Sequence, residues 1–152
     1  MLKKEVGVTF ILLVITIIVL LIVGTAVATA GISTYNESKV KIYLKEMDAI
    51  REKINLYQQK ANINPDLNFE EIGRSVDEVE SAKNVLRTLE ISEDEYDEYR
   101  YLSSKDIASE LSLENMSDDI IINVKSKKIY SISPIKYNDK LYYSAEDLRN
   151  DV

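Results

Sequence analysis

The sequence predicts an α+β protein in which one long N-terminal helix is packed by short helices and a small antiparallel sheet of three or four strands. Three observations predict this fold. The chain opens with an uncharged apolar segment, continues with a helical pattern of alternating apolar and charged residues, and ends with short strand-like runs separated by turn residues. At 152 residues, the part beyond the apolar segment is long enough for a single domain.

The first feature is an uncharged stretch over residues 8–36. Its apolar part of roughly 23 residues would form a helix of about 34 Å, enough to cross a bilayer core of about 30 Å. Helix is the expected state, because backbone groups in lipid must bond within their own segment. Lys3 and Lys4 precede the stretch and predict a cytoplasmic N-terminus with the body of the chain outside. We therefore expect a single-pass cytoplasmic membrane protein with residues 1–7 as a cytoplasmic leader and residues 8–31 as the transmembrane half of the helix.

Three interpretations of this segment compete. A secretory signal has an apolar region of about 7–15 residues before a small-residue cleavage site. This run is longer, although Thr25-Ala26-Val27-Ala28 imitates such a site. A plain uncleaved anchor accounts for the length and the charge. The third interpretation depends on the order of residues at the start of the apolar run.

That junction has the sequence Lys3-Lys4-Glu5-Val6-Gly7-Val8-Thr9-Phe10-Ile11-Leu12, and the apolar run continues without a break. A short basic leader, then Gly, then hydrophobic-Thr-hydrophobic-hydrophobic resembles the N-terminal signal of type IV pilins and type II secretion pseudopilins. In that family, a membrane-embedded peptidase cuts after the Gly and methylates the new N-terminus. The resemblance implies cleavage between Gly7 and Val8, methylation of Val8, and an assembly helix that begins with Val8, Thr9, Phe10, Ile11 and Leu12.

One residue departs from the usual family pattern. The fifth residue after the cut is usually a Glu that neutralises a neighbour's N-terminal ammonium, whereas here it is Leu12. Glu5 lies in the leader, and the next acidic residue is Glu37. A buried unpaired ammonium is strongly unfavourable. Either another subunit supplies the carboxylate, as expected for a minor or tip subunit, or the chain follows a Gram-positive-like version of the family that lacks this Glu and assembles differently.

The helical pattern continues over residues 32–61, the expected amphipathic half of the long helix. Its apolar stripe follows a period of 3.6 residues and consists of Val40, Tyr43, Leu44, Met47, Ile50, Ile54 and Tyr57. Ile42, Ala49 and Leu56 form a second, narrower row at seven-residue spacing. An apolar stripe in water must be covered. Two partners are open: a coiled-coil partner, or the chain's own C-terminal domain, as the resemblance to pilins implies.

Residues 62–152 are expected to form a small globular α+β pilin-like domain. A turn cluster at residues 62–66 ends the long helix. Ser75, Ser92 and Ser103 each open a capping-box pattern and so predict three short helices. Strands are expected at residues 120–124, 128–132, 135–137 and 141–143, with hairpin loops at Lys125-Ser126-Lys127 and Asn138-Asp139-Lys140. The order of a capped helix and then a hairpin with a tyrosine-rich strand, over residues 101–131, is similar to the C-terminal part of Gram-positive pilin-like chains.

Composition and motifs argue against catalysis. The chain has 19 basic and 26 acidic residues, a net charge of −7, and neither Cys nor His. Disulfides, zinc sites of Cys or His, and thiol or imidazole chemistry are therefore excluded, and an acidic body predicts no direct binding of nucleic acid. Ser133-Pro134-Ile135-Lys136 has the Ser-x-x-Lys spacing of penicillin-interacting enzymes but lies between expected strands rather than at a helix start. We expect no catalytic residue and no cofactor.

One acidic cluster is a candidate for calcium binding. It consists of Glu93, Asp94, Glu95, Asp97 and Glu98. The cluster lacks the alternating ligand spacing and the turn glycine of a calcium-binding loop. A solvated helical face is therefore the favoured interpretation, and no metal site is predicted.

The sequence-based hypothesis is a structural subunit rather than an enzyme: a pilin or minor pseudopilin of a type IV pilus or of a type II secretion or competence-type pseudopilus. The resemblance implies as partners a prepilin peptidase, other pilin or pseudopilin subunits, an assembly ATPase and platform protein, and membrane lipid before assembly. It also implies a cell-surface fibre after assembly. Two alternatives are an uncleaved, signal-anchored extracytoplasmic binding or sensory domain, and a membrane-tethered hydrolase.

Overall fold

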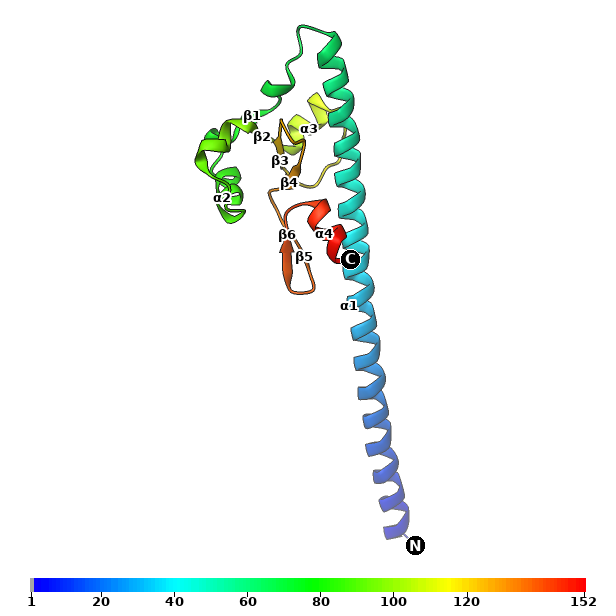
Figure 1. Ribbon diagram of the computed structural model, residues 1–152. Helices are drawn as coiled ribbons and strands as arrows, with labels where there is room; N and C mark the ends of the chain where they lie inside the picture. The colour runs from blue at the N-terminus through cyan, green and yellow to red at the C-terminus, as the bar shows by residue number, and fades with distance from the viewer. Residues whose placement is uncertain (1) are drawn as a thin grey trace. The chain divides into compact units, whose positions relative to one another are not determined.

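The computed structural model describes the backbone of residues 2–152 and the side chains of residues 7–22 and 36–152. The chain is divided into two compact units, Met1–Lys39 and Val40–Val152 (Figure 1). The first unit is helical, and the second contains the strands and the remaining helices. The predicted α+β class is confirmed.

Helix α1 spans Leu2–Ile63 and so belongs to both units. It begins inside the expected leader rather than at Val8. Its end lies within two residues of the predicted one, where Pro65 follows Asn64. A residue before proline is disfavoured in the helical region, and proline has no backbone N–H to continue the hydrogen-bond ladder. The turn cluster therefore ends the helix, as predicted.

Four strands of the second unit form one antiparallel sheet in the order β1-β2-β3-β4. They are β1 (Arg74–Ser75), β2 (Tyr99–Leu102), β3 (Ile120–Asn123) and β4 (Ile129–Ser131). β3 and β4 were predicted and are joined at the predicted loop, where Lys127 has a positive φ of 62°. β1 and β2 were not predicted.

Both faces of this sheet are covered, as Figure 1 shows with α1 on one side and α2 (Glu80–Thr88) on the other. Side chains alternate between the two faces of a strand. In β3, Ile120 and Ile122 pack with α1, whereas Ile121 packs with α2. This arrangement explains why β3 consists of consecutive isoleucines rather than alternating apolar and polar residues.

The core on the α1 side contains the middle of the predicted apolar stripe. Met47, Ile50 and Ile54 pack in one cluster with Leu102 and with Ile120 and Ile122 of β3. Helix α3 (Ser104–Glu110) contributes Ile107 to the same cluster. Burying one such side chain is worth about 1.5–3 kcal/mol. The stripe therefore attaches this part of α1 firmly to the sheet.

The core on the other face is rich in tyrosine. Tyr99, Tyr101 and Tyr130 extend from the sheet towards Val85 and Leu86 of α2. The rings of Tyr99 and Tyr130 lie 6.4 Å apart and are tilted by 41°. These tyrosines are packing residues, as the sequence predicted for Tyr130.

The capping-box prediction is confirmed at Ser103 and wrong at Ser92. The Ser103 hydroxyl accepts from the Asp106 backbone N–H, and the Asp106 carboxylate accepts from the Ser103 backbone N–H at 2.9 Å, which opens α3. Ser92 makes no such side-chain bond, and a 3₁₀ helix at Glu93–Glu98 follows it. The turn stops there because Tyr99 enters the sheet as the first residue of β2.

The prediction at Ser75 is correct only in part. Its hydroxyl accepts from the Asp77 backbone N–H at 3.3 Å, but it caps the short 3₁₀ helix Val76–Glu78. α2 begins only at Glu80, after a break at Val79 that has no side-chain cap. Val76 is fully buried against the sheet. Its packing accounts for the early break in the predicted helix.

The two remaining predicted strands exist but do not join the main sheet. β5 (Ile135–Tyr137) and β6 (Lys140–Tyr142) form a separate hairpin. Asn138 and Asp139 form its turn with φ values of 47° and 62°, as two-residue hairpin loops require. The prediction of one sheet is wrong here, because the N–H of Ser131 at the end of β4 donates to Tyr143, beyond β6, instead of to β5.

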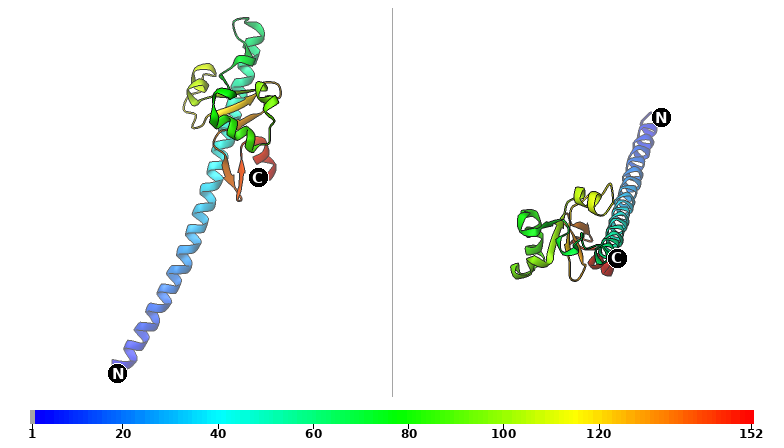
Figure 2. Two further views of the ribbon diagram at one scale, coloured as in Figure 1. Left: turned by 90° about the vertical axis from the view of Figure 1, so that its left-hand side faces the viewer. Right: turned by 90° about the horizontal axis from the view of Figure 1, so that it is seen from above.

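The last element, helix α4 (Ala145–Asp151), was not predicted. Ser144 caps it by accepting from the Asp147 backbone N–H. Figure 2 shows α4 and the β5–β6 hairpin close together at the end of the C-terminal unit. The Tyr142 hydroxyl links them by donating to Asp151 at 2.6 Å.

Candidate functional site

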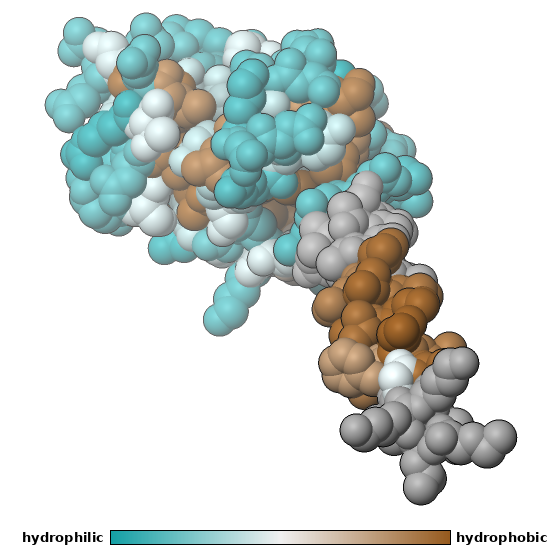
Figure 3. All heavy atoms as spheres, turned by 90° about the horizontal axis from the view of Figure 1, so that it is seen from below, coloured by the Kyte–Doolittle hydropathy of each residue, from teal (hydrophilic) through white to brown (hydrophobic). Residues whose placement is uncertain are grey.

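The segment that carries the predicted processing site is helical and exposed. Gly7 and the residues up to Ile22 all lie in α1. Val8 is 67% exposed and Leu12 63% exposed, although both are apolar. Figure 3 shows this stretch as an almost continuous apolar surface. A helix that is apolar all round needs a nonaqueous environment.

The helix satisfies one of its few polar side chains internally. The Thr16 hydroxyl donates to the Leu12 carbonyl oxygen at 2.8 Å. Such back-bonding lets a hydroxyl enter an apolar environment without an unpaired donor. Thr16 is thus compatible with lipid or with neighbouring helices, and it leaves the surface around Leu12 without a charged group.

The side chains of residues 7–22 and 36–152 give no packing reason for glycine at position 7. A Cβ atom built on it would meet no atom within 4 Å. Glycine in a helix interior is less favourable than alanine by about 1 kcal/mol. Gly73 is the opposite case: its φ is +63°, and a Cβ there would lie 2.2 Å from the Tyr101 carbonyl oxygen. The fold accounts for Gly73 but not for Gly7.

Parts of the predicted site lie outside the described side chains. These are the leader residues Lys3, Lys4 and Glu5, and the second half of the predicted transmembrane segment, from residue 23 to residue 31. Within residues 7–22 and 36–152, no helix combines the length and the apolar character needed to cross a bilayer.

From Val40 onwards, the apolar stripe of α1 is covered by the chain's own C-terminal domain, which was one of the two predicted partners. Val40 packs with Tyr142 and Leu148, and Ile54 packs in the core beneath the sheet. In the second row, Ile42 is 58% and Leu56 42% exposed, whereas Ala49 is half-buried. The main stripe is therefore the more buried of the two predicted apolar rows, and the second row is the more exposed.

Polar contacts reinforce the attachment of α1 to the domain. The Tyr43 and Ser131 hydroxyl oxygens are 2.7 Å apart, and the Arg51 guanidinium lies 2.6 Å from the Glu146 carboxylate. Arg149 pairs with Asp48. The contributions of α4 were missed because a seven-residue helix at the chain end is easily overlooked, although Ser144-x-x-Asp147 has the spacing of a cap.

Two tyrosines that join α1 and β2 to their surroundings have raised pKa values. Burial raises the pKa of Tyr43 to about 12, partly opposed by its hydrogen bond with Ser131. Burial also raises the pKa of Tyr101 to about 12, with a further contribution from the hydroxyl's bond to Asp119. A phenol with such a pKa stays protonated near neutral pH. These tyrosines act as packing and hydrogen-bonding groups.

The candidate chemical motifs are dispersed in the structure. Lys136 of the Ser-x-x-Lys motif forms an ion pair with Asp139 at 3.4 Å, while the Ser133 backbone N–H donates to Asp118. In the acidic cluster, Glu98 pairs with Lys125, and Glu93, Asp94 and Glu95 are exposed. Within residues 7–22 and 36–152, no three acidic side chains are grouped to hold a metal ion.

The chain matches no protein-family model, and it matches neither a curated protein nor a solved structure.

Proposed function

We propose that this chain is a structural subunit of a type IV pilin-like or pseudopilin-like fibre, inserted in the cytoplasmic membrane by its N-terminal helix and processed after Gly7. It acts by packing rather than by catalysis. In this proposal, α1 packs with other subunits in the fibre core, and the C-terminal domain is carried on the outside of the fibre. The partners are a prepilin peptidase, other subunits of the fibre, and the ATPase and platform protein that drive assembly.

The observation that carries the proposal is the exposed apolar surface of residues 8–22. Thirteen large apolar side chains of this segment are exposed. Burying each of them is worth about 1.5–3 kcal/mol, so water is a poor resting environment for the segment. Lipid can cover it before assembly, and equivalent helices of other subunits can replace the lipid afterwards.

The order of the N-terminal residues favours a helix that is cleaved after Gly7 over an uncleaved membrane anchor. Gly7 follows a basic leader and precedes Val8-Thr9-Phe10-Ile11. Among the residues whose side chains the structure describes, none packs against Gly7 in a way that would require glycine there. Recognition by a peptidase that cuts after glycine is a reason external to the fold.

Because residue 12 is Leu rather than Glu, we favour a minor or tip subunit over the main subunit of the fibre. After cleavage, the ammonium of Val8 has no acidic residue of its own chain nearer in sequence than Glu37. A neighbour with a carboxylate near its own N-terminus would neutralise that ammonium. A fibre built mostly of another subunit provides such a neighbour.

The experiment is an intact-mass measurement on the protein extracted from membranes of its native cells. We expect the loss of residues 1–7 and the addition of one methyl group to Val8. Gly7→Leu is expected to keep the full-length mass, whereas Lys4→Arg, which retains the leader charge, is expected to be processed. A native protein that keeps residues 1–7 in cells with an active prepilin peptidase contradicts the proposal.

One alternative is an uncleaved anchored domain that binds or senses a ligand outside the cell. It is favoured by the presence of Leu rather than an acidic residue at position 12. A simple anchor does not need a carboxylate in its apolar segment. This alternative predicts that Gly7→Leu leaves the mass, the membrane location and the function unchanged. The same measurement therefore separates the two functions.

A further inference from the structure

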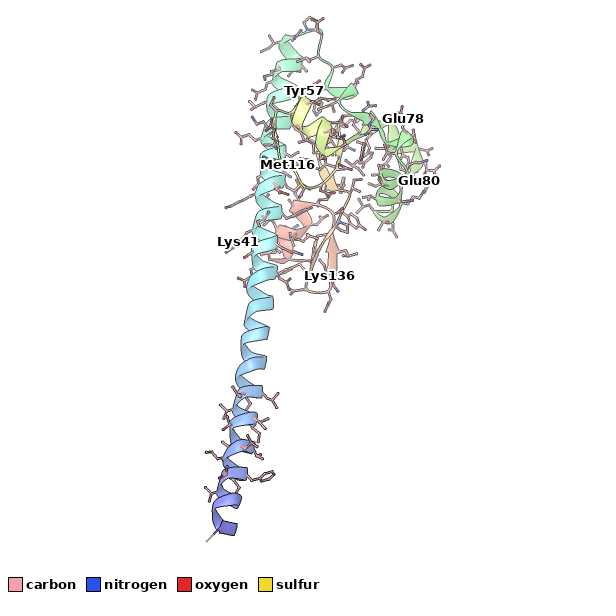
Figure 4. All side chains as sticks on the ribbon, turned by 180° about the vertical axis from the view of Figure 1, so that it is seen from behind. Lys41, Tyr57, Glu78, Glu80, Met116 and Lys136 are labelled. Atoms are coloured by element: carbon pink, nitrogen blue, oxygen red, sulfur yellow. The ribbon has the colours of Figure 1, made fainter. Side chains whose placement is uncertain are left out.

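We propose that a cavity of the C-terminal unit binds a primary alkylammonium group. This α1–β3 cavity is formed by α1, by the loop before β3 and by β3 itself, and its lining includes Glu46, Met47, Ile50, Met116, Asp118 and Ile120. Figure 4 shows Met116 beside α1, on the loop that contributes this side of the cavity. The inference does not depend on the proposed assembly function.

The size of the cavity restricts the ligand. Its volume is about 180 Å³. That volume is well above the roughly 10–15 Å³ needed for one water and below the roughly 300–1,000 Å³ of pockets for drug-sized molecules. A ligand that consists of a short alkyl chain with one polar end has a size that fits this cavity.

Part of the lining is apolar and suits methylene groups. Met47 and Ile50 of α1 and Ile120 of β3 are at most 5% exposed and belong to the main core cluster. Met116 packs against the same cluster. Methionine side chains are flexible and polarizable, so they adapt to ligands of slightly different shape. This part of the cavity therefore favours a hydrocarbon chain over a fully polar ion.

The charge of the lining selects a cation. Glu46 and Asp118 both line the cavity, and no lysine or arginine is among its lining residues. Burial raises the pKa of Asp118, which means that its negative charge is incompletely solvated. A cation placed beside the two carboxylates would relieve that penalty, whereas an anion would increase it.

The two carboxylates are held in place but retain acceptor capacity. Glu46 accepts from the Ser117 hydroxyl at 3.1 Å. Asp118 accepts from the backbone N–H groups of Asp119 and Ser133, both at 2.9 Å. An ionised carboxylate has about four acceptor sites, and an ammonium offers three donors. A primary ammonium in the cavity can therefore donate to acceptor sites that these carboxylates leave open, which a quaternary ammonium, lacking N–H groups, cannot do.

Two of the hydroxyl groups that line the cavity are engaged with each other rather than with the carboxylates. Tyr43 and Ser131 are hydrogen-bonded to each other, with their oxygens 2.7 Å apart. Recognition thus rests on the two carboxylates and the apolar side chains of the lining. This combination is complementary to an alkylammonium such as a short free amine or the end of a lysine side chain.

The test is a titration of the full chain in detergent micelles with n-butylammonium, followed by NMR of the backbone amides. We expect saturable binding with shifts at Ile120, Ser131 and Ser133. Butyrate and 1-butanol serve as probes of equal chain length with a negative or neutral end. Failure of n-butylammonium to saturate, or equal binding of 1-butanol, overturns the proposal.

Variants localise the binding. Glu46→Gln and Asp118→Asn each remove one charge at nearly constant volume, and we expect each to weaken n-butylammonium binding by roughly tenfold. Glu52→Gln, on an exposed position of α1, is the matched control and should bind as the parent does. Unchanged affinity in Glu46→Gln overturns the proposal even if Asp118→Asn fails to fold.

Two further ligands distinguish the source of the ammonium. 1,4-Diaminobutane represents a free diamine, and Nα-acetyl-lysine methylamide represents a lysine side chain of a protein. Preferential binding of either supports the proposal and identifies the source. Binding of neither, together with no saturation by n-butylammonium, counts against the site.

Discussion

The hydroxyl oxygens of Tyr43 on α1 and Ser131 at the end of β4 lie 2.7 Å apart, although 88 residues separate them in the sequence. Ser131 is almost fully buried, with 1% of its surface exposed. The bond therefore joins the amphipathic part of α1 to the sheet inside the domain. It also gives a buried polar group its partner, which interiors require.

A double-mutant cycle tests this link. We expect Tyr43→Phe to destabilise the protein by about 1–3 kcal/mol, because it leaves the buried Ser131 hydroxyl without its partner. Ser131→Ala should cost about 1 kcal/mol, and the double variant less than the sum of both. Urea unfolding of the full chain in a mild detergent measures the three values. Additive effects would show that the two hydroxyls are not coupled.

Alkaline pH should weaken the fold. Tyr43, Tyr101, Tyr130 and Tyr142 each have a pKa raised to about 12, against about 10 in an unfolded chain. Burial is the main cause for the first three, and the bond to Asp151 is the main cause for Tyr142. The stabilisation is complete below pH 10 and is lost as the pH rises towards about 12, because the unfolded chain releases these protons first.

Ultraviolet titration of tyrosinate checks this expectation. Of the ten tyrosines in the chain, a group should titrate near pH 12 in the folded protein and near pH 10 in urea. Tyr43→Phe should remove one member of the late group. Titration of all tyrosines near pH 10 in the folded state would contradict the assignment.

Two serines with similar sequence contexts should respond differently to alanine. Ser103→Ala removes a hydroxyl that caps α3, so we expect a loss of about 0.5–2 kcal/mol. Ser92→Ala is the matched control, because its side chain makes no capping bond and little change is expected. Thermal unfolding compares the two variants. Equal losses would mean that the cap at Ser103 contributes nothing specific.

Apolar packing, rather than ion pairing, should dominate the attachment of α4 to α1. Leu148 is fully buried in a cluster with Val40 and Tyr142, so Leu148→Ala should cost about 2–5 kcal/mol. Arg51 and Glu146 are 36% and 48% exposed, and Arg51→Gln should cost less than about 1 kcal/mol because solvent screens the pair. Denaturant midpoints in low and high salt measure both variants. A larger effect of Arg51→Gln than of Leu148→Ala would reverse this ranking.

Sequence reasoning succeeded wherever the signal was periodic and local. The apolar stripe from Val40 to Tyr57 predicted the buried face of α1, because 3.6-residue spacing places its members on one side. The turn at Asn138-Asp139 was found because few residues adopt a positive φ without strain. The capping pattern at Ser103 was confirmed because its hydrogen bonds join residues only three positions apart, Ser103 and Asp106.

Sequence reasoning failed where partners distant in the chain decided the conformation. Tyr99–Leu102 has two strand-favouring tyrosines but is only four residues long, and it forms β2 because β1 and β3 pair with it on both sides. The pattern at Ser92 looked like a helix start, but the following residues had to enter this strand. The cavity beside Glu46 was also unforeseen, since Asp118 lies 72 positions further along the chain.

The sequence alone determined that residues 8–31 are uncharged, that Gly7 stands at their start, and that the stripe on residues 40–57 needs a cover. These features follow from residue order and helical periodicity. Only the tertiary structure decided what covers the stripe, which strands form the sheet, and that the sheet is buried on both faces. The physical reason is that long-range pairing and burial depend on the combined fit of many segments, which no local pattern contains.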